Sequence, residues 1–353
     1  METVELRSDT FTMPTGAMLA AMTRAPLGDD VYGEDPTVRR LEELAADRLG
    51  MAAGCLMPSG TMANLATLMA LTPRGGRVFA GRDSDIYVYE AHGASVLGGI
   101  ALDPVGTDEH GRLDLDELAR AMPEDPDDPQ FSVPAVVCVE NTANRAGGIP
   151  LGPADLAEVA AVARANGLAV HMDGARVFNA AVALGLAPAE LAGHAGSVQF
   201  CLSKGLSAPV GSVVTGSREL IGRVRRVRKM LGGGMRQAGV LAAAGIEALD
   251  TMVDRLAEDH EHARVLADGL ADIPGIEVDP ARVRTNMVRF RVRDGRLSHR
   301  SLVAEAAGKG VRLAELGRGH LRAVTHRGVD AAAVTRAVAV VAAVMGAHGR
   351  AAS

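Results

Sequence analysis

The segment Gln199-Phe200-Cys201-Leu202-Ser203-Lys204-Gly205-Leu206 is an apolar run that ends in Ser-Lys-Gly. Thirty-one residues before Lys204, a second run, Val170-His171-Met172-Asp173-Gly174-Ala175-Arg176, reaches Asp173. Apolar runs of this length are typical of strands buried inside a sheet. The sequence therefore predicts one strand that ends in an aspartate, followed by another that ends in a lysine.

This pair of strand ends predicts a pyridoxal 5'-phosphate site. The amine of Lys204 can form an imine with the aldehyde of the cofactor, and the carboxylate of Asp173 can keep the pyridine nitrogen protonated, so that the ring accepts electrons. A lysine before glycine is usually a solvated loop residue, and an aspartate after an apolar run is usually a turn residue. The two together, at this spacing, favour the cofactor.

Around this pair, apolar runs alternate with helical patterns from about residue 50 to 215, which predicts an α/β fold with a mostly parallel sheet. The expected strands are 77–80, 135–140, 168–172, 197–202 and 210–215, and the expected helices start at 62, 113 and 153. A long helical stretch, 239–270, leads to strands near 286–292, 311–316 and 320–325 and to helices at 301–308 and from 330. We expect a large cofactor-binding domain, 1–250, and a small α+β domain, 251–353.

Composition narrows the class of protein. The chain has 353 residues, of which 48% are hydrophobic, and a net charge of -6, which argues against nucleic-acid or anionic-membrane partners. No apolar run reaches the ~20 residues of a membrane span. Three separated cysteines, the absence of metal-ligand spacing and the absence of a secretory signal at the N-terminus favour a cytoplasmic enzyme without a metal.

Other residues are candidates for binding an anion. Gly60 and Thr61 open a helix, where free backbone N–H groups suit a phosphate, although an ordinary N-cap explains them equally well. Arg176 could reach the cofactor or a substrate carboxylate. Arg236 follows three glycines and could meet a phosphate, and the basic segment 223–229 before it is expected to be a solvated or subunit-facing helix.

Several motifs in order resemble the L-threonine aldolase and β-eliminating lyase family, across nearly the whole chain. They are Arg7-Ser8-Asp9-Thr10, the segment 29–37, Pro58-Ser59-Gly60-Thr61-Met62-Ala63-Asn64, His171 to Arg176, Leu202 to Leu206, Gly232 to Gln237 and Leu321 to His326. The resemblance implies the fold type I architecture of pyridoxal phosphate enzymes, with a seven-stranded sheet, and a homotetramer with active sites shared between subunits.

The resemblance also implies roles for individual residues. Lys204 is the imine lysine, and Asp173 is the partner of the pyridine nitrogen. The cofactor would further be bound by Gly60, Thr61, Ser203 and Arg176, and by Arg236 from a neighbouring subunit; the amino acid substrate would be bound by Ser8, Tyr32, Arg176 and Arg322.

Two positions depart from the family pattern. Members usually carry a histidine that stacks on the cofactor where this chain has Asp85, and a second histidine where it has Ala143. Those histidines normally contact the β-hydroxyl of the substrate, so their loss removes the obvious means of moving its proton. Asp85 thereby becomes a candidate catalytic residue.

The leading hypothesis is retro-aldol cleavage of a β-hydroxy-α-amino acid to glycine and an aldehyde. The alternative is a diverged lyase that performs β-elimination, β-replacement or glycyl transfer to an unusual aldehyde. Asp85 would suit an amine-bearing side chain, and Ala143 would leave room for a larger one. A third hypothesis is a catalytically silent binding protein, which the retention of Lys204, Asp173 and Arg176 disfavours.

Overall fold

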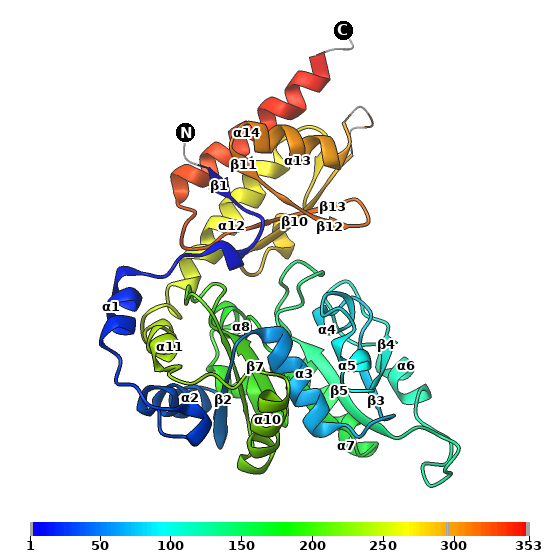
Figure 1. Ribbon diagram of the computed structural model, residues 1–353. Coiled ribbons are helices and arrows are strands. Elements are labelled where there is room, and N and C mark those ends of the chain that lie inside the picture. Colours follow the sequence, from blue (N-terminus) through cyan, green and yellow to red (C-terminus); the bar gives the residue numbers. More distant parts are fainter. Residues whose placement is uncertain (1–2, 294, 296, 351–353) are drawn as a thin grey trace.

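The computed structural model of the chain describes residues 3–293, 295 and 297–350. Its larger part is built on a seven-stranded sheet in the order β2-β8-β7-β6-β5-β3-β4, in which only β8 runs antiparallel to its neighbours (Figure 1). The strands are β2 Ala53–Met57, β3 Arg77–Gly81, β4 Ala101–Val105, β5 Pro134–Glu140, β6 Ala169–Asp173, β7 Ser197–Cys201 and β8 Ser212–Gly216. This confirms the predicted α/β fold and its mostly parallel sheet.

Helices cover both faces of this sheet, because successive side chains of each strand point to opposite faces. One face packs against α3 Gly60–Leu71, α4 Asp85–Val88, α5 Gly93–Val96 and α10 Arg218–Met230. The other packs against α1 Gly16–Arg24, α2 Pro36–Arg48, α6 Leu115–Arg120, α7 Pro153–Ala165, α8 Val177–Leu184, α9 Pro188–Ala192 and α11 Gly239–Thr251. In β2, for example, Leu56 joins one core, whereas Cys55 and Met57 join the other.

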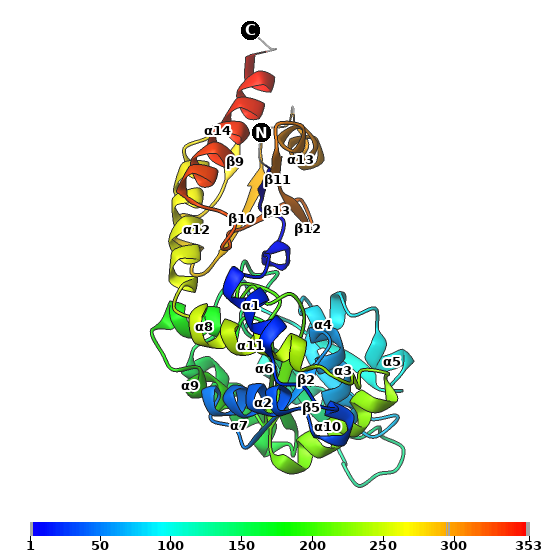
Figure 2. The ribbon, with the colours of Figure 1, turned by 60° about the vertical axis from the view of Figure 1, so that its left-hand side comes forward.

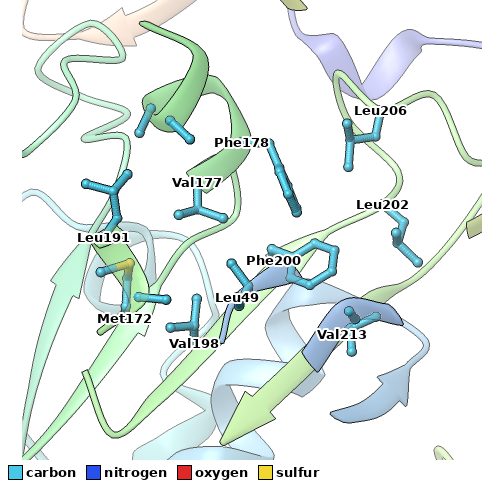
Figure 3. Close-up of a cluster of buried hydrophobic side chains, with 14 of the residues drawn as sticks. Leu49, Met172, Val177, Phe178, Leu191, Val198, Phe200, Leu202, Leu206 and Val213 are labelled. Atoms are coloured by element: carbon cyan, nitrogen blue, oxygen red, sulfur yellow. The ribbon is translucent and has the colours of Figure 1, made fainter. Parts of the chain in front are cut away.

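The core beneath β7 contains two of the six phenylalanines of the chain. Phe178 of α8 and Phe200 of β7 pack edge to face, with ring centroids 5.1 Å apart (Figure 3). Leu202 and Leu206 lie beside them on the segment that carries Lys204. The loop that presents the lysine is therefore anchored by buried apolar side chains on both sides of it.

A smaller α+β part stands at one end of the large sheet (Figures 1 and 2). Its antiparallel sheet has the order β12-β13-β10-β9. Its elements are α12 Leu256–Ala271, β9 Ile276–Glu277, β10 Met287–Val292, α13 His299–Gly308, β11 Val311–Arg312, β12 Ala314–Gly317, β13 His320–Val324 and α14 Ala331–Arg350. Short 3-10 helices lie at Asp9–Phe11, Asp30–Tyr32 and Pro280–Arg282.

The N-terminal residues belong with this smaller part. Strand β1 Val4–Glu5 pairs with β11, and Leu6 lies in the core that α12, α13 and α14 share. These residues were expected in the large domain, because a two-residue strand has no sequence pattern that reveals its partner. The expected boundary near residue 250 itself stays a prediction.

The predicted helix over 239–270 is two helices, α11 and α12, with a turn in which the Leu256 N–H donates to the Val253 carbonyl. The reason is that α11 packs in the large core and α12 in the small one, so the chain turns between them. Two strands of the large sheet were missed: β2, in which Gly54 interrupts the larger apolar side chains, and the edge strand β4, which contains Asp103 and Pro104.

Helix α10 differs in one respect from the expected solvated or subunit-facing helix. Arg228 is buried, forms an ion pair with Asp30 at 2.8 Å and donates to the Leu56 carbonyl. Its long side chain reaches the end of β2 because Val224 and Val227 hold this face of the helix against the sheet.

The C-terminal helix α14 is, by length and composition, apolar enough to cross a membrane, with a mean hydropathy of 1.6 over Ala331–His348. One face of it, including Val334, Val341 and Val344, is buried in the smaller core. The helix of a protein core meets the same criterion.

Candidate active site

The candidate site lies where β5, β6 and β7 end. In the sheet register, Glu140 pairs with Asp173, and Asp173 pairs with Gln199. Lys204 follows β7, and its carbonyl accepts a hydrogen bond of 2.8 Å from the Thr12 hydroxyl. Crevices at the carboxyl ends of strands are the usual binding sites of open α/β sheets. The structure therefore brings the two residues of the predicted cofactor pair to one edge.

The carboxylate of Asp173 is held by three donors. Its Oδ1 accepts from the Gln199 amide at 2.5 Å and from the Ala175 N–H at 3.1 Å, and its Oδ2 accepts from the Asn64 amide at 3.0 Å. A carboxylate has about four lone-pair positions, so one remains for a further donor. The Oε1 atom of Gln199 is also buried without a partner among the described residues.

Asn64 is itself oriented by a buried relay. The Ser197 hydroxyl lies 2.9 Å from Nδ1 of His171, and Nε2 of His171 lies 3.0 Å from Oδ1 of Asn64. Since Oδ1 can only accept, Nε2 of His171 carries the proton and Nδ1 accepts from Ser197. The relay fixes the Asn64 amide with its donors toward Asp173 and Glu90. Asn64 and His171 both belong to motifs of the family resemblance, but neither was among the predicted site residues.

Burial lowers the pKa of His171 from 6.5 to about 4. Because the folded state binds the proton less readily, the unfolded state takes it up first as the pH falls below 6.5. We expect this residue to remove about 3 kcal/mol of the free energy of unfolding between pH 6.5 and 4. Urea unfolding of the wild type and His171→Gln at pH 7 and pH 5 checks this: the wild type should lose more on acidification, and equal losses would contradict it.

Three further carboxyl groups surround Asp173. Burial, and then the charge of Asp173, raises the pKa of Glu90 to about 8. Burial, followed by the charges of Asp85 and Asp173, raises the pKa of Glu140 well above its usual range. Glu140 accepts from the N–H of Asp85 at 2.5 Å and from that of Asn144 at 2.6 Å. Glu90 and Glu140 are therefore groups that can retain a proton near neutral pH.

Asp85 connects to Arg322 through a residue that the sequence analysis missed. The amide of Asn144 donates to Oδ1 of Asp85 at 2.9 Å, and its Oδ1 accepts from Nη1 of Arg322 at 2.5 Å. Arg322 also donates to the Arg7 carbonyl, and its Nε is buried without a partner among the described residues. Asn144 directly follows Ala143, where the family resemblance implies a histidine. This position next to an expected site residue could have predicted that Asn144 belongs to the site.

Arg176, a predicted ligand of cofactor and substrate, is largely engaged within the chain. Its Nε and Nη2 atoms donate to the two carboxylate oxygens of Asp9, both at 2.7 Å, and both side chains are buried. Burial would raise the pKa of Asp9, but the charge of Arg176 outweighs it and holds the pKa well below its usual range. Asp9 is thus a structural partner that the Arg-Ser-Asp-Thr motif contained without a stated role.

Helix α3 begins beside the lysine segment. Ser59 caps it by accepting from the Met62 N–H at 3.2 Å, and the N–H groups of Gly60 and Thr61 have no partner in the described part of the chain. A Cβ on Gly60 would lie 2.9 Å from Sγ of Cys201, so glycine permits the close approach of the helix to β7. The hydroxyl of Ser203 donates to the Gly211 carbonyl at 3.4 Å. These orphan N–H groups suit an anion.

Of the remaining predicted ligands, Tyr32 and Arg236 are not gathered into this cluster, whereas Ser8 lies between Arg7 and Asp9, which contact Arg322 and Arg176. Ser8 caps the first 3-10 helix by accepting from the Thr10 N–H at 3.2 Å. Tyr32 is 77% exposed, and Arg236, half-exposed, pairs with Asp29 at 2.9 Å. No hydrogen bond or ion pair among residues 3–293 joins Tyr32 or Arg236 to Asp173 or Lys204.

The donor set fits a pyridine aldehyde with a phosphate arm. Lys204 has no hydrogen bond or ion pair on its amine in the described chain; only its backbone carbonyl is bonded, to the Thr12 hydroxyl. Asp173 has a free acceptor position for a ring N–H, and the start of α3 has free N–H donors for a phosphate. Together these features provide an amine, an anion and an anion-binding helix end on one side of the sheet.

The chain is similar to known lyases and aldolases in sequence and in structure. The family model described as beta-eliminating lyase matches residues 5–293. Low-specificity L-threonine aldolase 1 of Arabidopsis thaliana is 43% identical over 328 residues, 92% of each chain, and low specificity L-threonine aldolase of Escherichia coli K12 is 46% identical over 289 residues, 82% of this chain and 84% of that one. The structure of Leishmania major threonine aldolase superposes with a TM-score of 0.80 at 19% identity, over 97% of this chain and 99% of that one.

Proposed function

Because the chain belongs to the beta-eliminating lyase family, we propose that it is a pyridoxal phosphate-dependent aldehyde-lyase. It cleaves the Cα–Cβ bond of L-β-hydroxy-α-amino acids, such as L-threonine and L-allo-threonine, to glycine and an aldehyde, or forms that bond in reverse. The relatives that are 43% and 46% identical carry the name of this activity. The single structural observation that carries the proposal is the free amine of Lys204 at the sheet edge where three donors orient Asp173.

The bound cofactor supplies a ring that withdraws electrons from the bond to be broken. Lys204 would hold its aldehyde carbon, Asp173 would keep the proton on its ring nitrogen, and the N–H groups of Gly60 and Thr61 would bind its phosphate. The relay through Asn64 prevents the Asp173 carboxylate from rotating away from the ring. These groups are in place before the substrate arrives, which lowers the cost of reorganisation during the reaction.

The substrate carboxylate is bound by Arg322, together with the face of Arg176 that Asp9 leaves free and the hydroxyl of Ser8. Asn144 fixes Arg322 and Asp85 relative to each other. The Oδ2 atom of Asp85, whose Oδ1 is occupied by Asn144, accepts the proton of the β-hydroxyl when the Cα–Cβ bond breaks. Glu140, whose pKa is raised by burial and then by the charges of Asp85 and Asp173, accepts the N–H of Asp85 and so holds the backbone of that residue in place.

We also propose a homotetramer in the cytoplasm, without nucleic-acid or membrane partners, in which subunits share active sites. Tyr32 and Arg236 support the shared site, because both are exposed and close together: the Asp30 N–H donates to the Arg236 carbonyl. Side chains in this position are available to a neighbouring subunit's substrate and cofactor phosphate. Light scattering measures the assembly, and a monomeric active enzyme would overturn this part of the proposal.

The proposed reaction is tested with threonine, allo-threonine and phenylserine under saturating cofactor. Glycine and the matching aldehyde should appear in equal amounts from at least one of them. If none of the three releases glycine, the ordinary aldolase function is wrong. Ammonia and a keto acid without glycine would indicate elimination instead.

A specific observation favours the diverged alternative as second candidate. Ala143 and Glu140 line a cavity of about 240 Å³, so the place where the family resemblance implies a histidine is open space. Such a cavity can take a larger β-substituent than a methyl group, and Asp85 can interact with an amine on it. β-Elimination, β-replacement or glycyl transfer on such an amino acid would then be the principal reaction.

Restoring both histidines tests whether their loss limits threonine cleavage. We expect the double variant Asp85→His, Ala143→His to cleave threonine about 10-fold faster or more, because a positioned general acid–base group contributes about 10²–10⁴-fold. Aldehyde release measures the gain. Asp85→His, Ala143→Leu is the matched control for position 143, because leucine fills space there without a titratable group; an equal gain in the control would show that the histidine at 143 contributes volume and not proton transfer.

A further inference from the structure

The cavity beside Ala143 reaches from the active-site edge to the smaller part of the protein. Glu140, the last residue of β5, Ala143 just after it, and Arg289 of β10 all line this cavity. Because Glu140 pairs with Asp173 in the sheet, the cavity at Glu140 lies one strand from the cofactor residues. Arg289 faces the same cavity as Ala143, the position at which the family resemblance implies a histidine.

The acidic side chains around the cavity are already occupied. Asp83 pairs with Arg145 and Arg318, Glu109 with Arg282, and Asp108 accepts from the backbone N–H groups of His110 and Arg112. Glu140 accepts two backbone N–H groups. None of these carboxyl groups forms an ion pair with Arg289; the charge of Asp83 acts favourably on it, but Asp83 is already paired with Arg145 and Arg318.

Arg289 has no carboxylate within 4.0 Å in the described part of the chain. Its Nη2 contacts His320 at 2.7 Å, which also receives Nε of Arg291, and its own Nε is buried without a partner. Burial, and then the charges of Arg291, Arg282 and Arg145, lowers its pKa. A half-buried guanidinium among other cations is unfavourable unless an anion approaches it.

Arg289 also lines a second cavity, of about 380 Å³, between β10 and the loop that contains Glu109. Arg289 therefore lies in the wall between the two cavities. Arginine binds carboxylates through two adjacent N–H groups, and here Nε is one donor that no described residue uses.

We propose that the cavity receives the β-substituent of the substrate and that Arg289 binds a carboxylate at the end of that substituent. This inference rests on the proposed function and names its substrate class: β-hydroxy-α-amino acids whose side chain ends in an acid. The substituent enters the cavity beside Ala143, and Arg289 selects the group at its end.

Binding is measured first, because it does not depend on turnover. 4-Carboxy-L-phenylalanine, 4-carbamoyl-L-phenylalanine and L-phenylalanine lack the β-hydroxyl and cannot undergo the cleavage, so calorimetric titration of the cofactor-loaded enzyme compares only their recognition. We expect the acid to bind about 10-fold to 100-fold more tightly than the amide, the range for a charge-assisted hydrogen bond. Equal or weaker binding of the acid would overturn the proposal without any variant.

Variants then assign the preference to the residue. Arg289→Gln should remove the preference for the acid, Arg289→Lys should keep part of it, and Arg293→Gln, an exposed arginine at the end of the same strand, should keep all of it. Thermal unfolding of each variant confirms that it is folded. A preference that survives Arg289→Gln would show that another group binds the acid.

Cleavage of the β-hydroxylated forms of the same three compounds separates this inference from the proposed function. If the acid binds best but none of the compounds, nor threonine, releases glycine, the pocket assignment stands and the aldolase function fails. If glycine is released without preference for the acid in either binding or cleavage, the aldolase function stands and the pocket assignment fails.

Discussion

Replacing Lys204 by alanine should yield a folded protein that has lost activity by about three orders of magnitude or more, because the nucleophilic amine that holds the cofactor is removed. The same variant should no longer be labelled when the cofactor-loaded protein is treated with borohydride, whereas the wild type should be labelled at this residue. The chain contains only three lysines, Lys204, Lys229 and Lys309, so peptide mapping identifies the site unambiguously.

Lys309→Ala is the matched control, since Lys309 is exposed at the end of α13, far along the chain from the cluster, and should keep both activity and labelling. The same experiment tests the alternative that the protein is a catalytically silent binding protein. A binder would retain its partner affinity in Lys204→Ala and would show no turnover in the wild type. Full activity of Lys204→Ala would remove the basis of the proposed function.

The sequence was most informative where burial on both faces leaves a clear pattern. The continuous apolar runs near 135–140, 168–172 and 197–202 coincide with β5, β6 and β7 within a residue or so at each end, and the segment predicted near 210–215 pairs beside β7 as β8. Edge and short strands such as β4 and β1 carry no such pattern, because solvent covers part of them and tertiary pairing decides their place.

For the site, sequence motifs predicted the lysine, the aspartate and Arg176, but not the residues that contact the predicted site side chains. Asn64, Asn144 and Asp9 lie 109, 59 and 167 residues from the groups that they contact, so only the fold brings them together. Arg176, by contrast, was predicted as a ligand of cofactor and substrate. Its place in the motif suggested a free ligand, whereas two of its nitrogens are committed to Asp9.

The buried pair of Asp9 and Arg176 leads to the largest expected change in stability. Asp9→Asn preserves the shape of the side chain but leaves the guanidinium of Arg176 buried without its counter-charge, which should lower the free energy of unfolding by about 3–5 kcal/mol. Denaturant unfolding with saturating cofactor measures the loss. Asp250→Asn is the matched control, because the Asp250–Arg48 pair is exposed and should contribute less than about 1 kcal/mol.

Removing both charges separates the contribution of the ion pair to the free energy of unfolding from the destabilisation caused by a single unpaired charge. The double variant Asp9→Leu, Arg176→Met should lose less stability than the sum of the two single variants, because neither member is then left charged and alone. Asn286, which donates to Asp9 at 3.2 Å, loses one acceptor in that variant, so some loss should remain. Strictly additive losses would show that the two residues act independently, and that the ion pair does not account for the burial of Arg176.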